Sequence, residues 1–138
     1  MAFRVPHKVM FQHCDPAGII FYPRYFEMIN ATVEEWFEHL GYPFSEMHGA
    51  AGTGIPMRHI EVSFEAPSRL GEMLAFDLSP RAPGRTSLGF SMVAHGGDVR
   101  RLVCTGTVVH MDKASGRPKP WPEMIRAAMA REAEEDPR

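Results

Sequence analysis

Residues 23–41, PRYFEMINATVEEWFEHLG, form the strongest helix pattern in this chain of 138 residues. Pro23 suits the first position of a helix, and Gly41 suits its end. The apolar side chains recur at intervals of three and four, so they share one helical face: Phe26, Ile29, Val33, Trp36 or Phe37, and Leu40. Four glutamates belong mostly to the opposite face: Glu27, Glu34, Glu35 and Glu38. A long helix with one apolar side must pack on another element.

The rest of the chain alternates apolar and polar residues with a period of two, which indicates half-buried strands. Before the helix the alternation covers residues 3–12, with one apolar side: Phe3, Val5, Val9 and Phe11. After a Gly- and Ala-rich loop at 49–54 it returns in three short runs, 60–64, 74–78 and 88–94. A β-branched run at 101–111 predicts a long buried strand, and Gly96-Gly97-Asp98 is a hairpin turn signal. We therefore expect these four strands in hairpin succession, and hence antiparallel.

These elements predict an α+β fold, with the long helix packed on the concave face of a curved five-stranded antiparallel sheet. The length suits a single domain over residues 1–138. Near the end we expect a short helix at 123–134, with four residues directed inward: Met124, Ile125, Ala128 and Met129. The charged residues 132–138 are expected to form a frayed tail.

The composition argues against several classes of protein. With 15 basic and 17 acidic residues the chain lacks the basic excess of a nucleic-acid binder. It has no apolar run long enough for a membrane span and no signal segment at its start, so we expect a cytoplasmic protein. Two cysteines make no disulfide framework. The adjacent residues His13, Cys14 and Asp15 do not have the spacing of metal ligands, so no metal site is expected.

Residues 11–30, FQHCDPAGIIFYPRYFEMIN, join the first strand to the helix and contain the candidate catalytic group, Asp15. Asp15 lies in a turn with Pro16 and Gly18. The first turn of the following helix offers unpaired N–H groups and a partial positive charge, which would polarise a carbonyl group placed there. A carboxylate beside such a site could attack the carbonyl or deprotonate a water molecule. Aspartate before Pro and Gly is also a common turn former, so the spacing alone leaves both interpretations open.

The segment 13–25, HCDPAGIIFYPRY, resembles the signature of the 4-hydroxybenzoyl-CoA thioesterase family. The shared features are a Thr/Cys-Asp-x-x-Gly core, an apolar triplet, and a Tyr or His that enters the helix with a Tyr three residues later. The order of the elements also matches. The ending resembles related acyl-CoA thioesterases, with a long strand followed by 116–120, GRPKP, and a short helix. The similarity covers nearly the whole chain.

This resemblance implies a hotdog fold, in which an antiparallel sheet wraps around a helix. It also implies that two subunits join edge to edge, with active sites at their interface. By position, Asp15 matches the catalytic carboxylate and Gly18 the glycine that lets the substrate approach. Tyr22 matches the residue whose backbone N–H faces the thioester oxygen; some relatives have a catalytic His there.

The resemblance also implies substrate-binding residues. Asn30 on the helix matches a position near the ring hydroxyl of the hydroxybenzoyl substrate, where the typical enzyme has Asp. The neutral amide can still bond a hydroxyl group. Arg85, Thr86 and Ser87 fall where the family places basic and hydroxyl side chains that bind the coenzyme, and a guanidinium group suits phosphates.

The function implied is hydrolysis of an acyl- or aryl-CoA, with benzoyl- and hydroxybenzoyl-CoA among the candidates, to free acid and CoA. Asp15 would act as nucleophile or general base without a cofactor. A phenol, whose ordinary pKa is ~10, is a poor base at neutral pH, so a Tyr at position 22 favours Asp15 as nucleophile. Two alternatives are a thioesterase for acyl-carrier proteins and a non-catalytic acyl-CoA-binding module. We expect a homodimer or homotetramer, because the sheet has open edges and the strand 101–111 is too apolar to stay uncovered.

Overall fold

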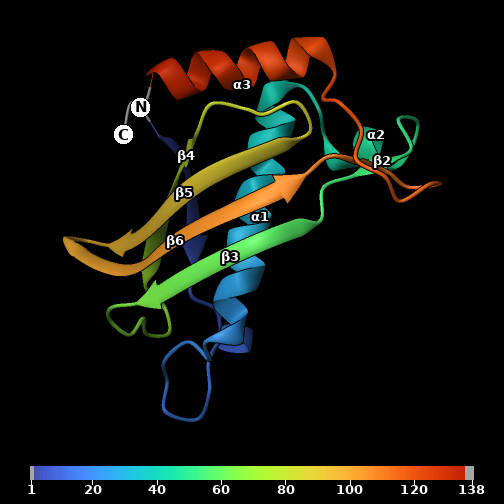
Figure 1. Cartoon of the computed structure of the whole chain (residues 1–138). Coiled ribbons are helices and arrows are strands. Elements are labelled where there is room, and N and C mark those ends of the chain that lie inside the picture. The colour runs from blue at the N-terminus through green and yellow to red at the C-terminus, as the bar shows by residue number, and fades with distance from the viewer. Residues whose placement is uncertain (1, 136–138) are drawn as a thin grey trace.

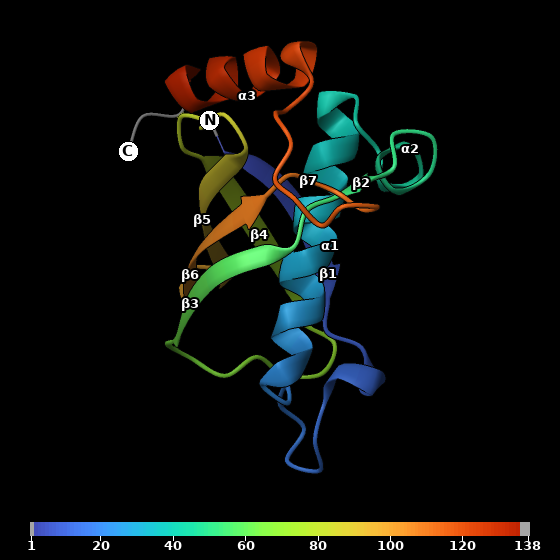
Figure 2. The same ribbon diagram turned by 45° about the vertical axis from the view of Figure 1, so that its right-hand side comes forward.

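The computed structural model describes residues 2–135. Five strands form one antiparallel sheet in the order β1-β4-β5-β6-β3. Their bounds are β1 (Phe3–Lys8), β3 (Met57–Phe64), β4 (Met73–Pro80), β5 (Ser87–Gly96) and β6 (Val99–Val109). The sheet curves around the long helix α1 (Pro23–Leu40), as Figures 1 and 2 show. The expected α+β class and the hotdog arrangement are confirmed.

Helix α1 buries one face in the core and begins and ends as the sequence predicts. Pro23 occupies its first turn, and Gly41 ends it in the left-handed conformation, with φ 95°. The buried face comprises Tyr25, Met28, Ile29, Thr32, Val33, Trp36 and Phe37. The expectation that Phe26 belongs to the buried face is wrong, since this residue is 37% exposed. The buried stripe passes through Tyr25 and Ile29, and Phe26 lies about 100° around the helix from Tyr25.

The predicted hairpin succession is correct for β4, β5 and β6 but wrong for β3. Gly97 provides the predicted hairpin turn between β5 and β6, with φ 58°. Strand β3 pairs with β6 and not with β4, so the chain crosses to the far side of the sheet after β3. As a result β6 is an inner strand with a neighbour on each side, and β3 is an open edge. The apolar strand 101–111 is therefore covered within one chain.

The first strand is shorter than the alternation over 3–12 predicts. It ends at Lys8, and a short 3-10 helix, η1 (Phe11–His13), follows. The N–H of Val9 donates to the Glu72 carbonyl and the N–H of Gly71 to the Val9 carbonyl, so Val9 still pairs with the segment before β4, and the chain leaves the sheet only at η1. Phe11 consequently does not share the buried side of Val5 and is 82% exposed.

Three further small elements were not predicted. Helix α2 (Phe44–His48) follows α1, and strand β2 (Thr53–Gly54) pairs with β7 (Met111–Asp112) beyond the main sheet. The predicted terminal helix is α3 (Glu123–Glu135), which buries Ile125 and Met129. Met124 is 84% exposed, so its expected inward direction is wrong.

Residues 132–135 of the expected frayed tail belong to α3 and contact the core helix. Glu132 accepts hydrogen bonds from Trp36 Nε1 (2.9 Å) and pairs with His39 Nε2 (2.8 Å), which ties the end of α3 to α1. Residues 136–138 lie outside the described part of the chain.

Candidate active site

Asp15 lies in a tight turn whose backbone bonds hold it in place. The Asp15 N–H donates to the Ile19 carbonyl (3.0 Å), and the Gly18 N–H donates to the Asp15 carbonyl (2.9 Å). The Ala17 N–H donates to Asp15 Oδ1 (2.9 Å), which orients the carboxylate. Gly18 has φ 79°, a conformation that glycine adopts at little cost. The turn therefore presents a partly exposed, oriented carboxylate before the start of α1.

The start of α1 offers a backbone N–H donor on Tyr22, the residue that the family resemblance matches to the position facing the thioester oxygen. Pro23 has no N–H, the Arg24 N–H donates to the Phe21 carbonyl and the Tyr25 N–H to the Tyr22 carbonyl. Among residues 2–135 no acceptor is found for the N–H of Tyr22. A free donor at a helix N-terminus, where the dipole adds a partial positive charge, suits a developing oxyanion.

Two shallow clefts lie at this end of the molecule. A cleft of about 340 Å³ is lined by Gln12, Cys14, Asp15, Pro16, Phe21 and Arg24. The second, of about 270 Å³, is mainly apolar and is lined by Ile20, Tyr22, Tyr25, Phe64, Glu65, Ala66 and Pro67. The Tyr22 ring meets Phe64 and Phe21 edge-on, at centroid distances of 6.0 and 5.7 Å. The aromatic side chains thus form a surface beside the Asp15 turn, at the end of the open edge strand β3.

The loop 66–72 supports the Asp15 turn from behind. The Ile20 N–H donates to the Ser68 carbonyl (2.9 Å), and the Leu70 N–H donates to the Gly18 carbonyl (3.2 Å). The buried Tyr25 hydroxyl donates to Ser68 Oγ (2.8 Å). The turn, the helix start and this loop therefore form one bonded unit.

Arg101, a buried cation on β6, holds the loop 66–72 in turn. Its guanidinium donates to both carboxylate oxygens of Glu72 (2.9 and 3.0 Å), to the Pro67 carbonyl (3.0 Å) and to Ser68 Oγ (3.2 Å). These bonds hold the pKa of the Glu72 carboxyl at about 2. Arg101 was not among the predicted site residues; an arginine at the start of an apolar strand pattern is the signal that could have revealed it.

The predicted coenzyme-binding residues lie at the other end of α1 from Asp15. The Thr86 carbonyl accepts from the His110 N–H (2.7 Å) and the Arg85 carbonyl from the Trp121 N–H (3.2 Å). His110 in turn contacts Tyr42, which follows the end of α1. Helix α1 has 18 residues and so is about 27 Å long. One chain therefore does not bring Arg85, Thr86 and Ser87 together with Asp15. Asn30 lies on the exposed side of α1.

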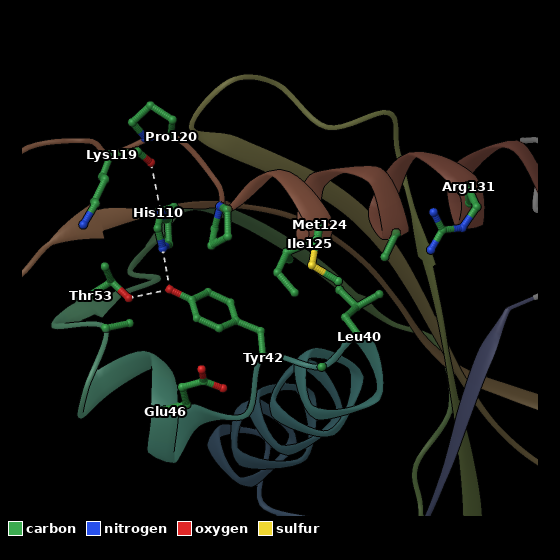
Figure 3. A pocket seen from close by; sticks show the side chains of 14 residues that line it. Leu40, Tyr42, Glu46, Thr53, His110, Lys119, Pro120, Met124, Ile125 and Arg131 are labelled. Carbon is green, nitrogen blue, oxygen red and sulfur yellow. Dashed lines mark hydrogen bonds between the residues drawn. The ribbon is translucent and has the colours of Figure 1, made fainter.

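A cavity of about 560 Å³, larger than both clefts, lies away from Asp15, between α3 and the corner of α1 and α2 (Figure 3). We call it the α3 cavity, and its lining residues are Leu40, Gly41, Tyr42, Glu46, Ala51, Thr53, His110, Lys119, Pro120, Pro122, Met124, Ile125, Ala128 and Arg131. It could not be predicted from the sequence, because its walls come from separate segments of the chain. Among residues 2–135 no group of three or more His, Cys, Asp or Glu side chains could hold a metal ion.

Residues 9–129 match the family model of the thioesterase-like superfamily. The match spans most of the 138 residues, so the chain belongs to this superfamily. The expectation of a thioesterase is thereby confirmed at the level of the superfamily. A search of curated proteins found no significant match.

Solved structures with the same fold include three of high similarity. The 4-hydroxybenzoyl-CoA thioesterase from Pseudomonas sp. strain CBS-3 has a TM-score of 0.83 at 20% identity, covering 92% of this chain and 98% of that one. The 1,4-dihydroxy-2-naphthoyl-CoA thioesterase Slr0204 from Synechocystis has a TM-score of 0.85 at 15% identity, covering 94% and 96%. The protein SAV2348 from Staphylococcus aureus, solved in complex with CoA, has a TM-score of 0.92 at 13% identity, covering 100% and 87%.

No helix within residues 2–135 is long and apolar enough to cross a membrane.

Proposed function

We propose that this protein hydrolyses an acyl- or aryl-CoA thioester, with Asp15 as the catalytic carboxylate. The observation that carries the proposal is the pairing of an oriented carboxylate with a free helix-start donor. Asp15 Oδ1 is held by the Ala17 N–H, and no described residue accepts from the Tyr22 N–H. A thioester carbonyl bonded to that N–H would be polarised for attack. Membership in the thioesterase-like superfamily supports the same reaction.

The aromatic surface beside the turn supports an aryl group as the acyl part. Phe21, Tyr22 and Phe64 are at least 47% exposed, and aromatic rings bind other rings in edge-on or offset geometry. Two of the structural relatives are named as thioesterases of aromatic CoA esters. Benzoyl-CoA and hydroxybenzoyl-CoA are therefore the first substrates to test.

A second copy of the chain would complete this site. Val109, next to Ser87 in the sheet, donates to the Pro56 carbonyl, so the coenzyme-binding segment lies at the β3 end that begins with Met57. Phe64 and the aromatic cleft lie at the other end of β3. If two β3 edges pair antiparallel, the start of one strand meets the end of the other. This pairing would bring the Arg85–Ser87 segment of the partner subunit toward the Asp15 end.

In the favoured mechanism, an oxygen of Asp15 attacks the thioester carbon and the C–S bond breaks. CoA leaves as thiolate and takes a proton from solvent, while the acyl group remains on Asp15 as a mixed anhydride. Water then hydrolyses the anhydride and restores the carboxylate. In the alternative, Asp15 accepts a proton from the attacking water. The exposed Tyr22 side chain is a poor base, so the proposal assigns a role only to its backbone N–H.

The first experiment is a thiol-release assay on a panel of acyl-CoA, aryl-CoA and acyl-carrier-protein esters. Asp15→Asn removes the negative charge at nearly constant shape, so turnover should fall at least ~100-fold. Tyr22→Phe keeps the backbone N–H and should keep turnover within a few-fold of the wild type. Asp98→Asn, in the β5–β6 turn, is the matched control. Wild-type turnover in Asp15→Asn would refute the assignment.

Single-turnover hydrolysis in heavy-oxygen water, together with borohydride trapping, separates the two mechanisms. Attack by Asp15, followed by attack of water on Asp15 Cγ of the anhydride, delivers an unlabelled enzyme oxygen to the first product molecule, and the label enters the Asp15 carboxylate. A fully labelled first product with unlabelled Asp15 fits the water mechanism and also attack of water on the acyl carbon of the anhydride. Borohydride, which reduces an Asp15 anhydride to homoserine, separates these two, because only the nucleophile mechanism yields homoserine at position 15.

A further inference from the structure

The α3 cavity has the properties of a small-molecule site that is separate from the Asp15 turn. Its volume of about 560 Å³ lies within the ~300–1,000 Å³ that is usual for ligand pockets. One wall is apolar, with Leu40 from α1 and Ile125, Met124 and Ala128 from α3 (Figure 3). Met124 is 84% exposed at this wall, so a ligand there would cover an apolar side chain that water now contacts.

The polar end of the cavity is a buried chain of hydrogen bonds. His110 Nδ1 lies 2.9 Å from the Lys119 carbonyl, which can only accept, so Nδ1 carries a hydrogen. At the other end of the chain the Thr53 hydroxyl donates to the Met47 carbonyl (2.8 Å). Between them the Tyr42 hydroxyl contacts Thr53 Oγ1 (2.7 Å) and His110 Nε2 (2.8 Å). His110, Thr53 and Tyr42 are at most 4% exposed, so water does not replace these partners.

This set of buried hydrogen bonds has one hydrogen too few when His110 is neutral. The four contacts then share three hydrogens: one on His110 Nδ1, one on Tyr42 and one on Thr53. A second ring hydrogen, on His110 Nε2, would supply the fourth and satisfy every contact. Burial opposes that charge by lowering the pKa of His110. An anion near His110 would offset the cost of protonating it, so this set of hydrogen bonds favours a ligand with negative charge.

The charged side chains that line the cavity also fit an anion. Arg131 lies at the Leu40 end and Lys119 at the His110 end, and Glu46 faces the cavity from α2 (Figure 3). Two cations against one carboxylate leave a positive balance before His110 is counted. Within residues 2–135 neither Arg131 nor Lys119 has a carboxylate at ion-pair distance.

We propose that the α3 cavity is a second ligand site, for an amphipathic carboxylate with an apolar body. The carboxylate lies at the His110 end, beside Lys119, and the apolar body extends along Leu40, Ile125 and Ala128. Binding is coupled to protonation of His110, whose surroundings are the hydroxyl groups of Tyr42 and Thr53, the Lys119 carbonyl, the ring of Trp121 and the charges of Glu46 and Lys119. The site does not depend on the proposed thioesterase reaction, because no residue of the Asp15 turn lines it.

Octanoate is the probe. Its binding is measured by calorimetry and through the fluorescence of Trp121, whose ring stacks on His110 at a centroid distance of 4.7 Å. Octanoate should bind saturably to the wild type and equally to Asp15→Asn. Octanamide, which lacks the charge, should bind several-fold more weakly. The affinity for octanoate should rise as the pH falls from 8 to 6, because the bound state favours protonated His110.

Two variants in the cavity wall locate the site. Ala128→Trp fills the cavity and should weaken octanoate at least tenfold, with the fold checked by circular dichroism. Lys119→Gln removes the cation at the His110 end and should weaken octanoate about three- to fivefold, the range for an exposed ion pair. Arg126→Gln removes a positive charge from α3 outside the lining and should leave affinity unchanged. Wild-type affinity in both Ala128→Trp and Lys119→Gln, equal affinity for octanamide, or loss of binding in Asp15→Asn would overturn the proposal.

Discussion

At the scale of single residues, the conformation of the Asp15 turn depends on Arg101, a side chain far away in sequence. Arg101 is 6% exposed, and its guanidinium bonds to Glu72, Pro67 and Ser68. The Ser68 carbonyl and the Leu70 N–H then bond to Ile20 and Gly18, just after the turn and within it. Burying a guanidinium is costly unless every donor finds an acceptor, and this loop supplies the acceptors. Arg101 is therefore a positioning residue for the proposed catalytic carboxylate.

Arg101→Lys should reduce both stability and turnover. Lysine keeps the charge but replaces the planar fork by a single ammonium group, so several loop acceptors lose their donors. We expect a loss of ~1–3 kcal/mol in the free energy of unfolding, the range for unsatisfied buried groups. The kcat should fall more than the KM rises, since the turn loosens while the aromatic surface persists. Arg100→Lys is the matched control, because Arg100 pairs with Glu65 on the surface. Urea unfolding and steady-state kinetics measure both effects.

At the scale of elements, two histidines join helix α1 and its surroundings to the sheet. His7 on β1 contacts Thr32 on α1 (3.0 Å). His110, between β6 and β7, contacts Tyr42 just after α1 (2.8 Å). Burial lowers the pKa of both imidazoles. Both junctions are therefore favourable in the neutral form of the histidine.

The stability of the ligand-free protein should consequently decrease as the pH falls below ~6.5, the pKa of an exposed histidine. The unfolded chain binds protons at His7 and His110 before the folded chain does, so protonation favours unfolding. The carboxyl of Glu72, whose pKa is lowered from 4.5 to about 2, stabilises the fold throughout this range. That stabilisation is lost only as the pH falls further toward 2. Urea unfolding at pH 8, 7, 6 and 5.5 tests this. His7→Gln should flatten the profile, whereas His59→Gln, at an exposed position, should not. A profile without slope in this range would contradict the prediction.

At the scale of the whole molecule, one chain carries only part of the proposed thioesterase site. The Asp15 turn and the aromatic surface lie at one end of β3, and Arg85–Ser87 at the other. Strand β3 is an edge with exposed apolar residues, Met57 and Phe64, and an unpaired edge of this kind favours pairing with another strand. The opposite edge, β1, contains Pro6, which lacks an N–H for such pairing. These features make β3 the proposed edge for dimerisation.

Light scattering should therefore return a mass of at least twice 15.5 kDa at micromolar concentration. Phe64→Glu places a charge at the end of the proposed interface and should lower both the mass and the thioesterase activity together. Val99→Glu, an equally exposed position in the β5–β6 hairpin, should change neither. A wild-type mass near 15.5 kDa would count against the dimer.

The class of fold, the start and end of α1 and the turn that presents Asp15 could be predicted from the amino-acid sequence alone. These features depend on local chemistry: periodicity, the helix-starting Pro23, and glycines at 18 and 41 that adopt positive φ. The inner position of β6, the open edge β3, the Arg101 clamp and the α3 cavity were decided by tertiary structure alone. Each depends on which strands pair and which distant segments meet. That choice is made by the packing of the whole core, and a periodic pattern records which face of a strand is buried without identifying its neighbour.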